Sequence, residues 1–163
     1  IQDAQSENER LSENAFLALE YIRDDKVHDF AGKLMGKKEH IEDVIHMLAN
    51  NYRQEDHDIL VSLVTSLKVT LKEAVPWHDP FMTILSMSES GKTEHFPREL
   101  LPYIYKHTLC SCCRFLALKE MSRRRMVTEE ILKECLYDSY EDIREFAKRK
   151  LNMAGTDEIP SVN

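Results

Sequence analysis

The residues of this sequence best suited to chemistry are a histidine and three cysteines that read His107-x-x-Cys110-x-Cys112-Cys113. Thiolates and an imidazole could bind zinc, with Cys135 nearby, and a cysteine beside a histidine could act as a nucleophile. The spacing is not that of two C-x-x-C zinc knuckles, and no glycine-rich turn lies nearby to hold an oxyanion. On a helix, Cys112 and Cys113 would face the apolar stripe and Cys110 would point away. We therefore predict buried thiols that pack as small hydrophobes, with no metal site and no catalytic residue.

Three further patterns resemble metal or phosphate sites, but each lacks the residue spacing or a residue that such a site requires. His40 with His46, and His57 between two aspartates, do not have the i, i+4 spacing of a helical metal face. The stretch SESGKT at 88–93 lacks the first glycine of a phosphate-binding loop and a preceding strand. We therefore predict solvated histidines, no cofactor and no enzymatic activity.

Two basic clusters are candidates for a binding site. Arg123, Arg124 and Arg125 end one predicted helix, and the Lys-Arg-Lys run at 148–150 lies near the end of another. Equivalent helix ends lie side by side in stacked hairpins, so one patch could hold an acidic peptide, a phosphorylated segment or a nucleic-acid backbone. In the alternative interpretation these cations complement the negative helix ends and pair with nearby glutamates.

Aromatic residues are the third candidate. Trp77 lies in the proline-bounded stretch VPWHDPF, where a single Trp is either a core residue or an anchor for a partner. Tyr103, Tyr105, Tyr137 and Tyr140 gather around the carboxy-terminal helices, where core packing is the default expectation. If several of them are exposed on one face, that face is the predicted interface.

Length, composition and charge fit one ordinary globular domain. The chain has 163 residues, of which 42% are hydrophobic and 31% charged, and its net charge is −7. This charge disfavours non-specific attraction to nucleic acid or lipid, although acids concentrate in residues 1–60 and basic clusters in residues 101–163. The cysteines lack a disulfide-like spacing, which favours the cytoplasm or nucleus. We expect no membrane span or signal segment, and the initial Ile indicates an excised domain or a processed chain.

Apolar residues recur with helical spacing along the chain and predict about nine helices. The helices are expected near residues 6–24, 27–35, 41–50, 58–74, 79–85, 97–105, 108–121, 128–136 and 139–152. Their predicted capping residues are Ser6, Asp79, Thr108, Thr128 and Ser139. Gly36 is expected in the left-handed conformation after the second helix, and residues 86–95 in a loop. We predict a single all-α domain of stacked antiparallel hairpins at residues 1–153, followed by a flexible tail at 154–163.

Two of the predicted helices share a weak internal repeat. Arg114 and Arg144 each precede an alanine by three residues, and a large apolar residue follows each alanine by four. The second copy resembles the second helix of a HEAT or armadillo-type repeat. This resemblance rests on Asp138, Asp142, Ile143, Arg144, Ala147 and Leu151. It implies a short, irregular α-solenoid, a class used chiefly as a scaffold for partner proteins.

The sequence therefore predicts a non-catalytic interaction or scaffold module of a larger intracellular assembly that binds a peptide or partner helix. The alternative is nucleic-acid or phosphopeptide binding through the carboxy-terminal basic patch. The predicted partner-binding residues are Trp77, Arg123, Arg124, Arg125, Tyr140, Lys148 and Arg149. Protein partners are expected, and no membrane or small-molecule substrate.

Overall fold

The computed structural model describes residues 1–66, 78–89 and 96–154, and in these ranges the chain is helical, with no strand. The described part contains nine α-helices and three short 3₁₀ turns, which confirms the predicted all-α class. The helices are α1 Glu9–Leu19, α2 Asp25–Leu34, α3 Ile41–Asn50, α4 His57–Ser66, α5 His78–Glu89, α6 Leu100–His107, α7 Ser111–Arg123, α8 Glu129–Cys135 and α9 Glu141–Ala154. None of these helices is long and apolar enough to cross a membrane.

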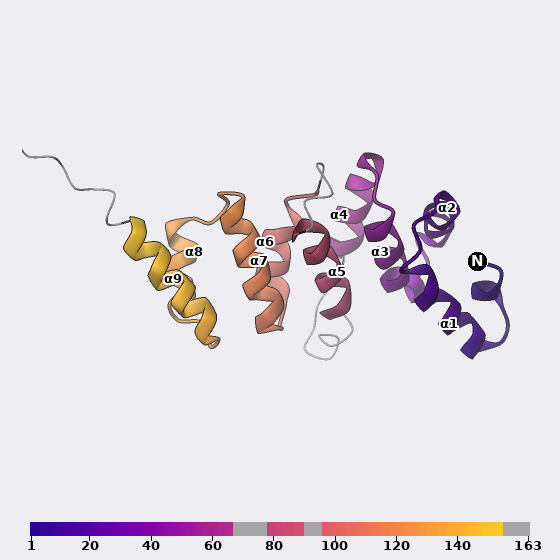
Figure 1. Ribbon diagram of the computed structural model, residues 1–163, viewed down its shortest axis with the longest axis horizontal. Helices are drawn as coiled ribbons and strands as arrows, with labels where there is room; N and C mark the ends of the chain where they lie inside the picture. The colour runs from indigo at the N-terminus through magenta and orange to yellow at the C-terminus, as the bar shows by residue number, and fades with distance from the viewer. Residues whose placement is uncertain (67–77, 90–95, 155–163) are drawn as a thin grey trace, which may run out of the picture.

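The helices stand in an elongated row that follows their order in the chain (Figure 1). Helix α6 packs most extensively against α7, α2 packs against α3, and α8 packs against α9, while α5 packs against both α3 and α7. The two ends of the described chain therefore lie at opposite ends of the molecule (Figure 1). Such a row leaves long side faces open to partners, in contrast to a spherical bundle.

Three apolar clusters along the row hold the helices together, and α3 belongs to two of them. Val44 and Leu48 of α3 pack with α1 and α2 in the amino-terminal cluster. Ile45 and Ala49, on the neighbouring side of the same helix, pack with α4, α5, α6 and α7 in the central cluster. Burial on two sides agrees with the many apolar residues of α3. Because α3 contacts both clusters, it connects the acidic amino-terminal end of the chain to the central helices.

The carboxy-terminal cluster joins α7 to the last hairpin. Leu118 of α7, Cys135 of α8, and Ile143 and Ala147 of α9 are buried there together. Cys113 of α7 belongs to the central cluster. Helix α7 therefore links two clusters, as α3 does.

The amino-terminal capping prediction was wrong by two residues. The side-chain oxygen of Asn8, not Ser6, accepts the Leu11 amide at 3.1 Å and caps α1. The Ser6 hydroxyl accepts the amide of Asn8 instead, so it braces the cap from outside the helix. At the end of α2, Gly36 has φ of 96°, which confirms the predicted left-handed residue.

Two caps in the carboxy-terminal half also differ from the prediction, whereas Thr128 caps α8 as expected. Helix α7 begins at Ser111 with Cys110 as its N-cap residue, and Thr108 accepts the Cys110 amide one step earlier. Helix α9 begins at Glu141, two residues after the predicted cap Ser139. At α7 that loop hydrogen bond competes with the helix for the Thr108 side chain, and before α9 the Asp138 carboxylate accepts the Tyr140 amide at 2.8 Å.

Helix α5 is longer at both ends than the sequence predicts. It begins at His78, so Asp79 lies inside its first turn, and it continues through Glu89 into the predicted loop. Helix α4 ends its described part at Ser66, and the remainder of the predicted 58–74 helix lies outside the described residues. Most of the predicted tail also lies outside them.

Candidate functional site

A groove on the amino-terminal half is concave and lined by acidic residues, and α1 forms one of its walls. Phe16 and Leu19 are buried on the core side of this helix. Glu20 follows the last residue of α1 and lines the groove together with Leu17 and Tyr21. The Leu17 residue is 57% exposed and Tyr21 is 81% exposed, so this wall offers apolar surface that the fold does not use.

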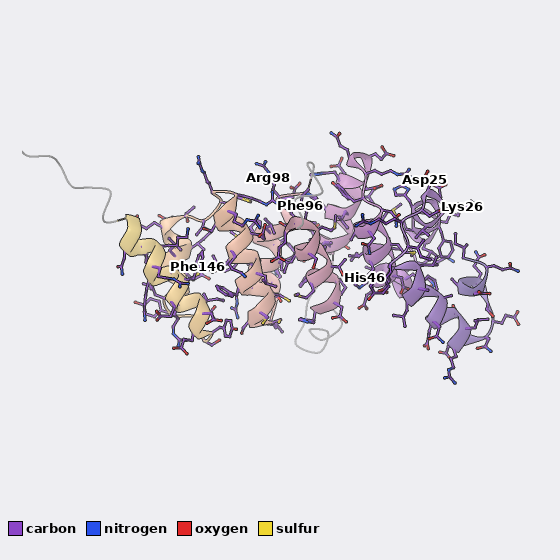
Figure 2. The ribbon with its side chains drawn as sticks, viewed as in Figure 1. Asp25, Lys26, His46, Phe96, Arg98 and Phe146 are labelled. Atoms are coloured by element: carbon purple, nitrogen blue, oxygen red, sulfur yellow. The ribbon has the colours of Figure 1, made fainter. Side chains whose placement is uncertain are left out.

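Helices α3 and α5 form the other walls. Glu42, Asp43 and His46 lie on the side of α3 that its two core faces leave free. The His46 side chain, labelled in Figure 2, bridges the two helices because its Nδ1 lies 2.7 Å from the Thr83 hydroxyl of α5. With Asp79 of α5, these residues surround a cavity of about 540 Å³.

A second cavity, of about 640 Å³, continues the first along α1. The two cavities share Leu17 and Asp43, and we call them together the acidic groove. The second cavity adds three carboxylates, those of Glu9, Glu13 and Glu39. The acidic groove is therefore long enough to follow more than one turn of α1, since Glu9 and Glu20 lie near opposite ends of the helix.

The charge of the acidic groove is one-sided. No Lys or Arg is among the described residues that line either cavity. Burial first, and then the nearby carboxylates of Asp43, Glu42 and Asp79, together raise the pKa of Glu20 to about 7. A carboxyl group held half-protonated near neutral pH indicates negative potential that no fixed cation offsets.

The neighbouring groups respond to the same surroundings. Burial, and then Asp79 and Asp43, raise the pKa of Glu42. Burial lowers the pKa of His46, although Asp79 and Asp43 act against that shift. The imidazole that faces the carboxylates is therefore disfavoured as a cation and does not neutralise them. Such a site favours an external cation, such as an Arg or Lys side chain of a partner.

No protein-family model, curated protein or solved structure matches this chain. The assignment of the acidic groove therefore depends on its own shape and charge. The resemblance of α9 to HEAT and armadillo repeats stays a prediction.

Arg124, a predicted binding residue, is engaged inside the fold. Its Nη2 donates to the carbonyl and the hydroxyl oxygen of Ser88, at 3.0 Å each, and its guanidinium lies over the Phe96 ring at 5.2 Å. The carboxylate of Glu120 lies 3.9 Å away and is itself buried. Arg124 therefore ties the end of α7 to α5 and to Phe96, which Figure 2 labels.

The other two arginines of this cluster are exposed. Arg123 Nη1 lies 2.6 Å from the Glu120 carboxylate, with most of its side chain in solvent. Arg125 has φ of 58° in the turn that closes α7, where the Met126 amide donates to the Met121 carbonyl. This is the hydrogen bond of a Schellman-type helix end, so the backbone of Arg125 has a structural role whatever its side chain binds.

The remaining predicted binding residues lie on or near α9 or outside the described part. Lys148 and Arg149 are exposed, and Lys148 pairs with Glu145 at 2.7 Å. Tyr140 is half-buried, edge-on to the Phe115 ring at 6.1 Å. Trp77 lies outside the described residues. The described contacts include none that joins the two basic clusters directly.

Sequence reasoning missed the acidic groove because its residues come from three separate helices. The available signal was the excess of acids in residues 1–60. That signal predicts an acidic region but not a cavity, since spacing along one helix does not reveal which carboxylates of another helix it faces.

Proposed function

We propose that this chain is a non-catalytic protein-interaction module whose acidic groove binds a basic, amphipathic helix of a partner. The observation that carries the proposal is the combination of one-sided charge with unused apolar surface at Leu17 and Tyr21. A partner helix with Arg or Lys beside Leu-type residues complements both properties. The apolar contacts would supply affinity, and the charges would steer the encounter.

The raised pKa of Glu20 supports a cationic ligand and gives the interaction a pH dependence. A guanidinium beside Glu20 would favour its ionised form and bring its pKa back down from about 7. Binding would therefore release a proton near neutral pH. Affinity for a cationic partner would fall as the pH drops below about 7, because the carboxyl must ionise to bind.

A scaffold role agrees with the arrangement of the last two hairpins. Ala117 and Ala147, the matching positions of the internal repeat, are both fully buried. Arg114 reaches the Asp138 carboxylate at 3.3 Å, and Arg144 donates to the Asp138 carbonyl at 2.8 Å. Both alanines of the repeat are buried and both arginines contact Asp138, which fits our proposal of a HEAT- or armadillo-like repeat in a scaffold of a larger intracellular assembly. The four free cysteines support a cytoplasmic or nuclear location.

The test is binding of a synthetic helical peptide that carries Leu at i and i+4 with Arg on both flanks. We expect fluorescence anisotropy to show saturable binding that weakens as salt rises. The double variant Glu20→Gln with Asp43→Asn should lose about tenfold or more in affinity, which corresponds to about 1.4 kcal/mol. Amide shifts in an NMR titration should cluster at Leu17, Asp43 and Thr83.

The matched control removes the same number of charges elsewhere. Glu130→Gln with Glu141→Gln changes two exposed acids in the first turns of α8 and α9, far along the row from the acidic groove (Figure 1). We expect this control to bind the peptide like the unmodified chain. An equal loss in both double variants would show that net charge alone attracts the peptide, and the proposal would be abandoned.

A second candidate function is phosphopeptide or nucleic-acid binding at the carboxy-terminal edge. The carboxy-terminal ends of α7 and α9 point to the same long edge of the molecule (Figure 1), and Arg125 and Arg149 are exposed near them. Charge reversal by Arg125→Glu with Arg149→Glu tests it, with a phosphoserine peptide and a single-stranded RNA as separate probes. A salt-sensitive affinity that this variant abolishes would favour the second candidate.

A further inference from the structure

A histidine and two cysteines from different parts of the chain meet beside the central cluster. His78 is the first residue of α5, Cys110 is the N-cap residue of α7, and Cys113 is the third residue of α7. One ligand atom from each, an imidazole nitrogen and two sulfurs, lies within 4.8 Å of the others. Among the described residues this is the one group of three or more His, Cys, Asp or Glu side chains with that geometry.

The separations agree with those of a tetrahedral zinc site. Typical Zn–S and Zn–N bond lengths of about 2.3 and 2.0 Å place N and S roughly 3.6 Å apart around one ion. The observed distance between Cys113 Sγ and His78 Nδ1 is 3.3 Å. The three donors therefore need only small side-chain movements to reach a common ion, and their soft and borderline character suits zinc.

Polar groups lie close to two of the donors. The Thr108 hydroxyl oxygen accepts the Cys110 amide at 3.2 Å. On the far side of the imidazole, Asp79 Oδ1 lies 4.0 Å from His78 Nε2. A carboxylate behind a histidine and a hydroxyl beside a thiolate are typical supports of metal ligands.

We propose that His78, Cys110 and Cys113 bind one Zn²⁺ ion that joins the start of α5 to the start of α7. Three protein donors leave the fourth tetrahedral position for water or a further ligand. The ion would add a cross-link between two helices that already pack against each other. It would also place positive charge next to Asp79, a residue of the acidic groove, although the proposal does not depend on the function of that groove.

The proposed zinc site uses a different histidine from the one in the sequence pattern His107-x-x-Cys110-x-Cys112-Cys113. His107 is stacked on Tyr103, with ring centroids 4.4 Å apart, and does not belong to the cluster. Cys112 is exposed, whereas Cys113 is buried. The expectation that Cys110 points away from Cys113 was wrong, because α7 begins at Ser111 and the N-cap residue turns back over the first turn of the helix.

The experiment is a Co²⁺ titration of the full chain under reducing conditions, since Co²⁺ reports thiolate ligands through visible and near-ultraviolet bands. We expect one equivalent of Co²⁺ to bind with thiolate-to-cobalt absorption and to be displaced by Zn²⁺. His78→Ala should weaken binding by more than about 100-fold, beyond the loss typical of an outer-shell partner. Its side chain is half-exposed, so the variant should fold, which circular dichroism verifies.

Matched controls are His107→Ala and Cys112→Ser, which remove the other histidine and cysteine of the sequence pattern. Both should keep the cobalt spectrum, whereas Cys110→Ser should reduce its thiolate absorption by about half because one of two sulfurs is lost. Zn²⁺ should raise the melting temperature of the unmodified chain and of both controls, but not that of His78→Ala. Absence of thiolate-to-cobalt absorption in the unmodified chain, or a spectrum that depends on Cys112 or His107 instead, would overturn the proposal.

Discussion

The buried carboxylates of the carboxy-terminal half and those of the acidic groove lie in opposite surroundings. In the carboxy-terminal half, Glu120 lies beside two arginines, and Asp138 faces Arg114 at 3.3 Å. In the amino-terminal half, Glu20 and Glu42 are partly buried among other acids. The first arrangement satisfies each charge within the fold, whereas the second leaves negative potential directed into a cavity.

This difference separates charges that hold the fold from charges that are available to a partner. A paired buried carboxylate is costly to remove, because its arginine is then left without a counter-charge. A crowded carboxylate opposes folding when it ionises, so its presence in the sequence calls for another explanation, and binding supplies one. The four predictions below test that contrast, from the largest expected effect to the smallest.

Glu120→Ala should lower the free energy of unfolding by about 3 kcal/mol. The variant leaves Arg124 without its nearest carboxylate while Ser88 and Phe96 still hold the guanidinium in place. Urea denaturation of the two proteins measures the difference. The control is Glu129→Ala, which removes an exposed pair with Lys133 and should cost less than about 1 kcal/mol. Equal effects of the two substitutions would contradict a structural role for Glu120.

Asp138→Ala should lower the free energy of unfolding by about 2 kcal/mol, as expected for loss of hydrogen bonds to a charged group. Its carboxylate accepts the Tyr140 amide at 2.8 Å and meets Arg114 at 3.3 Å, so it joins α7 to the loop before α9. Thermal and chemical denaturation both report the change. Lys148→Ala breaks only the exposed pair with Glu145 and is the control, with an expected loss below about 1 kcal/mol.

Glu20→Gln should make the chain more stable above pH 7, by about 1 kcal/mol after allowance for solvent screening. The folded pKa of Glu20 is about 7, above its ordinary value of 4.5, so the folded state holds this proton more tightly than the unfolded state. The resulting stability is complete below pH 4.5 and is lost as the pH rises to about 7. Urea denaturation across this range should show a decline in the free energy of unfolding of the unmodified chain, and the Glu20→Gln variant should lack that decline.

His46 changes stability with pH in the opposite direction to Glu20, so the measurement must separate the two residues. Burial lowers its pKa, so its contribution to stability is present above its ordinary value of 6.5 and is lost as the pH falls through the lower folded pKa. The difference in the free energy of unfolding between Glu20→Gln and the unmodified chain at each pH isolates the contribution of Glu20, because His46 is present in both proteins. A difference that does not change between pH 4.5 and 8 would show that Glu20 is not crowded by its neighbours.

Leu17→Ser should change the free energy of unfolding by less than about 0.5 kcal/mol, because Leu17 faces solvent. The same variant should weaken binding of the Leu–Arg peptide, so stability and binding separate at this residue. The adjacent Phe16→Ala is the opposite control, since Phe16 is buried and stacked on His40 at 4.7 Å, and it should cost about 3 kcal/mol. Unchanged peptide binding by Leu17→Ser would remove α1 from the proposed interface.

Much of the helical content could be predicted, because helices depend on neighbours three and four residues apart. The caps were less predictable: Thr128 caps α8 as expected, but Asn8 replaced Ser6, and Cys110 replaced Thr108. Several polar side chains stand near each helix start, and small energy differences among local hydrogen bonds decide which of them caps it.

The candidate site was far less predictable than the fold. The basic clusters were visible in the sequence, but the contacts of Arg124 with Ser88 and Phe96 were not. From the sequence, only His107 was considered with the thiols and no site was predicted, whereas the imidazole beside Cys113 belongs to His78, thirty-five residues before it in the chain. A single sequence carries little information about such distant pairs.

The sequence by itself determined that this chain forms a row of amphipathic helices with acids concentrated at one end, because helical periodicity and charge are local properties. The tertiary structure alone decided which charges are satisfied. Packing of α1, α3 and α5 brings Glu20, Glu42 and Asp79 to one cavity, and packing of α5 with α7 brings His78 to Cys113. The physical reason is that the energy of a charge or a metal donor depends on what surrounds it in space, and chain order does not specify those surroundings.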